Sequence, residues 1–198
     1  MGTSKLRRIC VYCGSSTGTR PEYRQAAEEL GRLLVERGYG LVFGGGGIGL
    51  MGVIADTVLA GGGEVIGVIP HGLEVREVAH QRCTEMRVVA SMHERKALMS
   101  ELASAFIAMP GGFGTLEELF EMITWAQLGI HDHPVGILDA GGYWSRLIAL
   151  LEHGITEGFI RPEMRRLYVA RATARELLDA IETHEGLDVP RWMTPNES

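Results

Sequence analysis

The residues best suited to chemistry lie in a short run that follows a strongly apolar segment. The run Pro110–Glu118 reads PGGFGTLEE and comes directly after the apolar residues Ala105–Met109. Three glycines allow the backbone to bend tightly at a helix start, and Thr115 adds a hydroxyl donor. The backbone N–H groups of residues 112–115 are therefore expected to surround a phosphate, assisted by the helix dipole.

Glu118, at the end of this run, has two interpretations. Thr115-x-x-Glu118 has the spacing of a capping box, in which a Thr N-cap and a Glu three residues later satisfy the first N–H groups of a helix. The sequence contains two further examples, Ser91-x-x-Glu94 and Thr173-x-x-Glu176. The second interpretation is that the carboxylate of Glu118 takes part in catalysis. The spacing alone leaves both interpretations open.

The helix that carries Glu118 is predicted over Leu116–Leu128. At about 100° per residue, its core stripe is expected at Leu116, Leu119, Phe120 and Ile123. Glu118 would then lie on roughly the opposite side, together with Met122 and Trp125. A face that carries these side chains away from the core predicts a site wall or the interface of a homodimer.

Two other loops could bind a phosphate. The run Gly44–Gly52 reads GGGGIGLMG and feeds a predicted helix, whose N-terminus favours anions. No acid ends the next strand and no Lys-Ser/Thr pair follows, so we interpret the run as a mononucleotide or phosphate loop, with Gly45 and Gly46 as candidate contacts. The run Cys13–Gly18 is a candidate for phosphate or ribose binding through Ser15. Purely structural turns remain the alternative for both loops.

A basic pair, Arg95 and Lys96, occurs in the first turns of a predicted helix, where cations oppose the helix dipole. Lys96 is one of only two lysines in the chain, so we consider it a candidate phosphate binder, with a solvated basic pair as the alternative. His131-Asp132-His133 is interpreted as a polar loop, and no metal site is predicted there.

These loops require strands and helices in alternation. Apolar runs predict strands at residues 6–13, 40–43, 64–69, 82–89, 104–109, 134–138 and 167–170. Amphipathic segments predict helices at residues 21–37, 50–60, 91–103, 116–128, 143–157 and 173–184. The order predicts a single doubly wound Rossmann-like α/β domain over residues 1–185, with a mostly parallel sheet of about seven strands flanked by helices. Residues 186–198 are predicted to form a flexible tail.

Composition limits the classes of function. The chain has 198 residues, of which 45% are hydrophobic, enough to build a full core. Its net charge of −6 argues against a nucleic-acid partner, and no apolar segment predicts a membrane span or a secretory signal. Three cysteines, Cys10, Cys13 and Cys83, do not suggest a disulfide framework, so a reducing, cytoplasmic location is expected. Alternation places Cys10 and Cys13 on opposite faces of a strand, which favours small buried side chains over a redox or metal site.

The chain resembles the Lonely Guy family of cytokinin riboside 5′-monophosphate phosphoribohydrolases, which are often labelled lysine decarboxylases. Pro110–Glu118 is similar to the family signature PGGxGTxxE, and Gly44–Gly52, Met92–Lys96 and Ile123–Ile130 also look like that family. The likeness covers roughly residues 6–180 in the same order.

The resemblance implies hydrolysis of the N-glycosidic bond of a cytokinin riboside 5′-monophosphate or AMP. It implies a homodimer or an assembly of dimers, and no redox cofactor. It also implies Arg95 and Glu118 as catalytic residues. The implied substrate contacts are Glu77, Arg95, Lys96, Gly111, Gly112, Phe113, Gly114, Thr115, Leu116, Glu117 and Thr124.

Two other functions remain as alternatives. A pyridoxal-phosphate lysine decarboxylase would need a lysine for the cofactor, and Lys96 is the candidate because Lys5 lies in the N-terminal tail. A non-catalytic nucleotide or cofactor carrier of the same fold could keep the glycine loops without Arg95 and Glu118. The joint presence of these two residues favours an enzyme.

Overall fold

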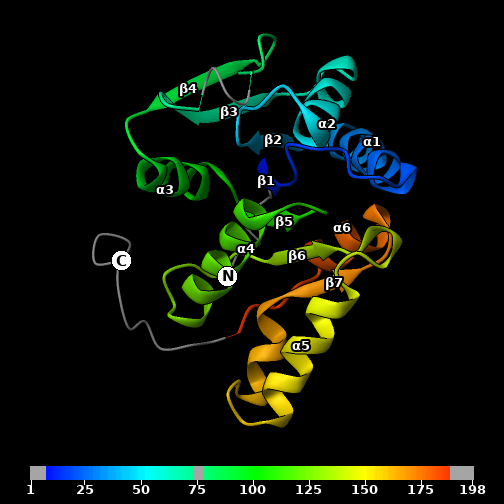
Figure 1. Cartoon of the computed structure of the whole chain (residues 1–198), viewed down its shortest axis with the longest axis vertical. Helices are drawn as coiled ribbons and strands as arrows, with labels where there is room; N and C mark the ends of the chain where they lie inside the picture. The colour runs from blue at the N-terminus through cyan, green and yellow to red at the C-terminus, as the bar shows by residue number, and fades with distance from the viewer. Residues whose placement is uncertain (1–7, 74–77, 188–198) are drawn as a thin grey trace.

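The computed structural model describes residues 8–73 and 78–187. The expected tail therefore lies outside the described residues from position 188 on. Seven parallel strands form one sheet in the order β4-β3-β2-β1-β5-β6-β7 (Figure 1). The strands are β1 (Arg8–Tyr12), β2 (Gly40–Phe43), β3 (Val65–Pro70), β4 (Glu85–Val89), β5 (Ala105–Ala108), β6 (Val135–Leu138) and β7 (Val169–Arg171).

Helices cover both faces of the sheet. One face packs against α1 (Pro21–Glu36), α2 (Gly49–Ala60) and α6 (Ala174–Glu182). The other face packs against α3 (Met92–Leu102), α4 (Phe113–Gln127) and α5 (Ser145–Thr156). Two short 3₁₀ turns, η1 (Ala140–Gly142) and η2 (Pro162–Leu167), precede α5 and β7. This arrangement confirms the predicted doubly wound α/β fold.

The alternation of side chains along β1 shows why its sequence is a continuous apolar run. Ile9 and Val11 belong to the core beneath α1, α2 and α6, whereas Cys10 and Tyr12 belong to the core on the opposite face. A strand covered on both faces needs apolar residues at every position. Cys13 lies on the face opposite Cys10, as predicted, and burial raises the pKa of both thiols. Burial therefore favours the neutral thiol at both positions.

Two of the three predicted capping boxes provide N-caps. Ser91 Oγ accepts a hydrogen bond from the backbone N–H of Glu94 at 3.1 Å, and Thr173 Oγ1 accepts one from Glu176 at 3.3 Å. The third box does not form, because α4 begins at Phe113 with Gly112 as its N-cap.

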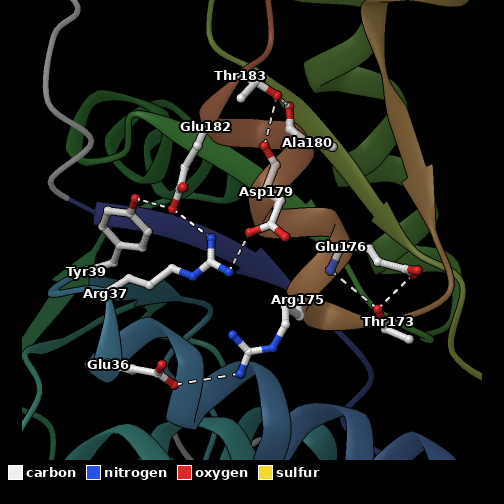
Figure 2. Close-up of polar contacts among 10 residues, drawn as sticks. All are labelled: Glu36, Arg37, Tyr39, Thr173, Arg175, Glu176, Asp179, Ala180, Glu182 and Thr183. Carbon is white, nitrogen blue, oxygen red and sulfur yellow. Dashed lines mark hydrogen bonds and ion pairs between the residues drawn. The ribbon is translucent and has the colours of Figure 1, made fainter.

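Polar contacts around Arg37 tie α6 to the end of α1 (Figure 2). Arg37 donates to Asp179 Oδ1 at 2.7 Å and to Glu182 Oε1 at 2.9 Å. Tyr39, at the start of β2, donates its hydroxyl proton to Glu182 Oε1 at 2.6 Å. Burial works to raise the pKa of Glu182, but the hydrogen bonds from Tyr39 and Arg37 lower it below its ordinary value.

Tyr39→Phe should lower the free energy of unfolding by about 1 kcal/mol at pH 7, because it removes one hydrogen bond to a carboxylate. The stabilisation belongs to the ionised form of Glu182, whose pKa is lowered on folding. This stabilisation is therefore present at pH values above the ordinary carboxyl pKa, and it is lost as the pH falls through the lower pKa that Glu182 has in the folded protein. Urea unfolding of both proteins at several pH values would measure the difference, and an equal difference at acid pH would contradict this assignment.

Among the described residues, no helix combines the length and the apolar content that crossing a bilayer requires.

Candidate active site

Three loops meet at the carboxyl edge of the sheet, beside β1, where the strand order reverses. They follow β1, β2 and β5, and backbone hydrogen bonds join them. Gly14 N–H donates to Pro110 O at 3.0 Å, and Leu50 N–H donates to Gly14 O at 3.0 Å. A cavity of about 230 Å³ lies between the loops, and Met51, Arg95 and Glu118 complete its wall. Ligands of doubly wound sheets bind at this position.

Glycine is required at two positions where the loops touch. Gly49 has a φ of +61°, and a Cβ there would lie 2.2 Å from the carbonyl carbon of Ser15. A Cβ on Gly111 would lie 2.1 Å from Thr115 Oγ1 and 3.0 Å from Gly14 N. Any larger residue would force the loops apart, so these glycines allow the backbone to form the cavity wall directly.

The start of α4 supplies unpaired backbone donors. The first helical hydrogen bond runs from Leu116 N–H to Gly112 O at 3.0 Å, so the N–H groups of the preceding residues have no partner within the helix. Residues 112–115 line the cavity. The predicted loop therefore borders the cavity, with the positive end of the α4 dipole directed toward it.

Arg95 and Glu118 face each other in this cavity. Their side chains are buried, with 6% and 7% of their residue surfaces exposed, and Arg95 Nη2 lies 3.8 Å from Glu118 Oε1. Arg95 also donates to Val68 O at 3.2 Å and to Gly44 O at 3.3 Å. These carbonyls belong to the ends of β3 and β2, so the sheet itself positions the guanidinium. The arrangement places one fixed cation and one carboxylate beside the anion-binding end of α4.

The structure excludes the capping interpretation of Glu118. Thr115 lies inside α4 and is buried, so it cannot be the N-cap. Glu118 is the sixth residue of the helix and lines the cavity. The facing guanidinium of Arg95 offsets the cost of burying this carboxylate.

The predicted rotation of α4 is wrong in part: Leu116, Leu119 and Ile123 pack against the core as predicted, whereas Phe120 and Met122 do not lie where they were expected. Its buried face consists of Thr115, Glu118, Leu119, Met122 and Ala126, whereas Phe120 is 37% exposed. Met122 is fully buried in the core and cannot form the expected interface. Apolar residues occur all round this helix, so more than one stripe fitted the sequence.

Lys96 contacts carboxylates of α4 and does not line the cavity. Its Nζ lies 2.5 Å from Glu117 Oε1 and 2.8 Å from Glu121 Oε1. Burial works to lower the pKa of Lys96, but the two hydrogen bonds raise it above its ordinary value. The cation therefore joins α3 to α4, one residue from the facing pair Arg95 and Glu118. Glu121 is not among the predicted site residues, although its position four residues after Glu117 indicates a shared helix face.

Of the other predicted substrate contacts, some line the cavity and others lie away from it. Ser15 lines the cavity, whereas Gly45 and Gly46 pack against the segment 78–80: Gly45 O accepts from His80 N–H at 2.9 Å, and Gly46 pairs with Ala79. Leu116 is half-buried, and Thr124 is exposed about two and a half turns beyond Thr115. Glu77 lies outside the described residues.

His131 and His133 form the polar loop that was predicted. His131 Nε2 lies 3.0 Å from Met122 O, and burial lowers the pKa of His131 to about 4, so the ring is neutral near pH 7. Within residues 8–73 and 78–187, no group of three or more His, Cys, Asp or Glu side chains is arranged to hold a metal ion.

Two further cavities flank the site. One of about 240 Å³ shares Gly14, Ser15 and Gly112 with it and is walled by Tyr23 and Tyr143. The other, about 750 Å³, is a groove between α1 and α2. Neither Arg95 nor Glu118 lines that groove, so the cavity of about 230 Å³ that contains both residues is the better candidate for chemistry.

The fold and the site together define a class: a doubly wound α/β protein with a ligand cavity at its switch point. Residues 51–181 match the family described as "Possible lysine decarboxylase". The chain is 53% identical to the cytokinin riboside 5′-monophosphate phosphoribohydrolase LOG of Oryza sativa subsp. japonica, over 91% of this chain and 75% of that protein. It is 52% identical to LOG3 of Arabidopsis thaliana, which carries the same enzyme name, over 93% of this chain and 86% of that protein. The chain belongs to the LOG family.

Similar solved structures support the fold alone. The molybdenum cofactor binding protein from Rippkaea orientalis superposes with a TM-score of 0.67 at 17% identity, covering 91% of this chain and 98% of that one. The molybdenum cofactor carrier protein of Chlamydomonas reinhardtii gives a TM-score of 0.67 at 19% identity, covering 90% and 97%.

Proposed function

We propose that this chain hydrolyses the N-glycosidic bond of a cytokinin riboside 5′-monophosphate or AMP, which releases the adenine-type base and ribose 5-phosphate. The observation that carries the proposal is the buried pair Arg95 and Glu118, 3.8 Å apart, beside the N-terminus of α4 in one cavity. The names of the LOG relatives support the same reaction.

Glu118 is the residue proposed to act on water. Cleavage of this bond passes through a transition state with oxocarbenium character, which a nearby carboxylate stabilises. Glu118 orients or deprotonates the attacking water and balances the positive charge on the sugar. Arg95 stabilises negative charge on the departing base or anchors the nucleotide.

The glycine loops hold the 5′-phosphate, so binding energy remote from the bond positions C1′ for attack. The N–H groups of Gly112, Phe113, Gly114 and Thr115 are the principal donors in this proposal, with Ser15 on the opposite wall. The remaining family contacts are proposed at Gly45, Gly46, Glu77, Lys96, Gly111, Leu116, Glu117 and Thr124.

A second copy of the chain is the proposed partner, in a homodimer or an assembly of dimers. The observation that supports it is the outer face of α4, where Phe113 is 92% exposed and Phe120 follows two turns later at 37%. Large exposed aromatic side chains on one helix face are typical of an interface. Three free thiols support a reducing, cytoplasmic location for the assembly.

Phe120→Glu should convert the dimer to a monomer, because it places a charge within the proposed interface. Light scattering at micromolar concentration should give twice the chain mass of 21.6 kDa for the wild type and the single chain mass for the variant. A wild-type protein that is already monomeric would contradict the proposed assembly.

Lysine decarboxylation fits the residues poorly. Lys96 is the one lysine in the described part of the chain, and its Nζ is held by Glu117 and Glu121, outside the cavity. A cofactor-binding lysine has to present a neutral amine to the aldehyde, whereas these contacts favour the charged form. The residues therefore do not fit pyridoxal phosphate.

Incubation with a panel of nucleoside 5′-monophosphates, followed by chromatography, tests the proposed reaction. The expected products are free base and ribose 5-phosphate. A carrier of the same fold would bind the nucleotide and return it intact.

A further inference from the structure

Tyr143 contacts the loop that follows β5 from the side of the neighbouring cavity, and the site described above gives it no role. Its hydroxyl donates to Gly111 O at 2.5 Å, across a sequence separation of 32 residues. Gly111 belongs to the loop after β5, whereas Tyr143 follows the turn η1 after β6. The contact therefore joins the loops of two neighbouring strands.

Tyr143 is 41% exposed, but two aromatic rings and a capped turn restrict its side chain. Asp139 caps the following turn, because its Oδ1 accepts from Trp144 N–H at 2.5 Å and its Oδ2 accepts from Ser145 Oγ at 2.8 Å. The Tyr143 ring packs edge-on against Tyr23, with centroids 5.7 Å apart, and against Trp144 at 4.9 Å. A side chain fixed in this way can fix its hydrogen-bond partner.

The Gly111 carbonyl, which accepts this hydrogen bond, belongs to a peptide between two glycines. Gly111 packs closely against Thr115 and Gly14, but Gly112 has open space where a side chain would lie, with no atom within 4 Å of a Cβ built there. Packing therefore orients only the Gly111 side of the peptide between them. Glycine backbones also have more conformational freedom than other residues. The preceding carbonyl, Pro110 O, is held by Gly14 N–H at 3.0 Å, and Gly111 O is held by Tyr143. Two successive carbonyls are thus fixed by neighbouring loops.

The direction of the Gly111 carbonyl sets the direction of a donor. The described chain has no cis peptide bond, and in a trans peptide the C=O of one residue and the N–H of the next point opposite ways. Gly111 O accepts from Tyr143, which lines the neighbouring cavity and not the active-site cavity. Gly112 borders both cavities, so its N–H, which points away from Tyr143, is directed to the active-site side.

We infer that Tyr143 is a positioning residue, which acts through the Gly111–Gly112 peptide to aim one N–H donor at the 5′-phosphate. The inference rests on the proposed function for the identity of the anion. It predicts that the Tyr143 hydroxyl affects the binding of phosphate-bearing ligands and leaves ligands without a phosphate unaffected.

The test compares Tyr143→Phe with Tyr39→Phe. Both changes remove one tyrosine hydroxyl and one short hydrogen bond and keep the ring. Tyr39, however, contacts Glu182 of α6 (Figure 2) and lines neither the active-site cavity nor its neighbour beside Tyr143. Tyr143→Phe should weaken the binding of ribose 5-phosphate, measured by calorimetry, by about three- to tenfold. KM for AMP should rise by the same factor, kcat should change less than twofold, and kcat/KM for adenosine should be unchanged. Tyr39→Phe should leave all four quantities at the wild-type values.

Two results with the Tyr143→Phe variant would overturn the inference. One is unchanged binding of ribose 5-phosphate by Tyr143→Phe, and the other is an equal loss of kcat/KM for AMP and adenosine, which would indicate a merely structural role. The calorimetry does not depend on catalysis. If the wild type bound ribose 5-phosphate but released no base from AMP, the proposed reaction would fail while the comparison still decided the role of Tyr143. A wild type that bound neither ribose 5-phosphate nor inorganic phosphate would refute both.

Discussion

Glu118→Gln is expected to lower kcat by about 10²–10⁴-fold, the range that general acid–base catalysis typically contributes. The amide keeps the size of the side chain but can neither accept a proton nor balance a cationic sugar. Ribose 5-phosphate should still bind, because the N–H groups at the start of α4 are unchanged. Steady-state kinetics with AMP would measure kcat, and calorimetry would measure the retained binding.

Glu176→Gln is the matched control for this change. Glu176 lies in α6 and has the same Thr-x-x-Glu spacing. Unlike Glu118, it belongs to a capping box that forms, because its backbone N–H donates to the N-cap Thr173. Gln is accepted at this position of a capping box, so turnover and melting temperature should both be unchanged. If Glu118→Gln also folded, bound ribose 5-phosphate and turned over AMP at the wild-type rate, its catalytic role would be wrong.

Removal of the phosphate from the substrate should have an effect of similar size. Hydrogen bonds to a charged group contribute about 1.5–3 kcal/mol each, so the four N–H donors of residues 112–115 predict a preference of about 10⁴-fold or more for AMP over adenosine. The preference should appear in kcat/KM, because the phosphate anchors the sugar while the bond breaks. Equal values for the two substrates would contradict the assignment of this loop.

Much of the fold could be predicted from the sequence because its signals are local. Strands such as β2 and β5 are short apolar runs that end at glycine or proline, and parallel strands covered on both faces require that pattern. The site loops were predictable for a related reason. Close backbone approach at Gly49 and Gly111 tolerates no side chain, so the glycines themselves mark where the loops meet.

The start and rotation of α4 could not be predicted in this way. The Thr115-x-x-Glu118 spacing suggested an N-cap that the structure does not have, because the helix begins at Phe113, within the glycine-rich run. The salt bridges of Lys96 could not be predicted either. Its partners Glu117 and Glu121 lie on another helix, and a single sequence does not show which helix faces pack together.

The contact between Tyr143 and Gly111 shows the same limit more strongly. A tyrosine after a glycine pair looks like an ordinary turn residue, and its importance depends on the neighbouring strands β5 and β6 lying side by side. Hydrogen bonds of this kind depend on topology, so they become visible only when the sheet order is known.

The measurement that tests the central claim most directly is product analysis after AMP or a cytokinin riboside 5′-monophosphate is incubated with the purified protein. Free base and ribose 5-phosphate should appear in equal amounts, at a rate that depends on Glu118. Release of inorganic phosphate with the nucleoside left intact would contradict N-glycosidic hydrolysis, and so would recovery of the unchanged nucleotide from a protein that binds it.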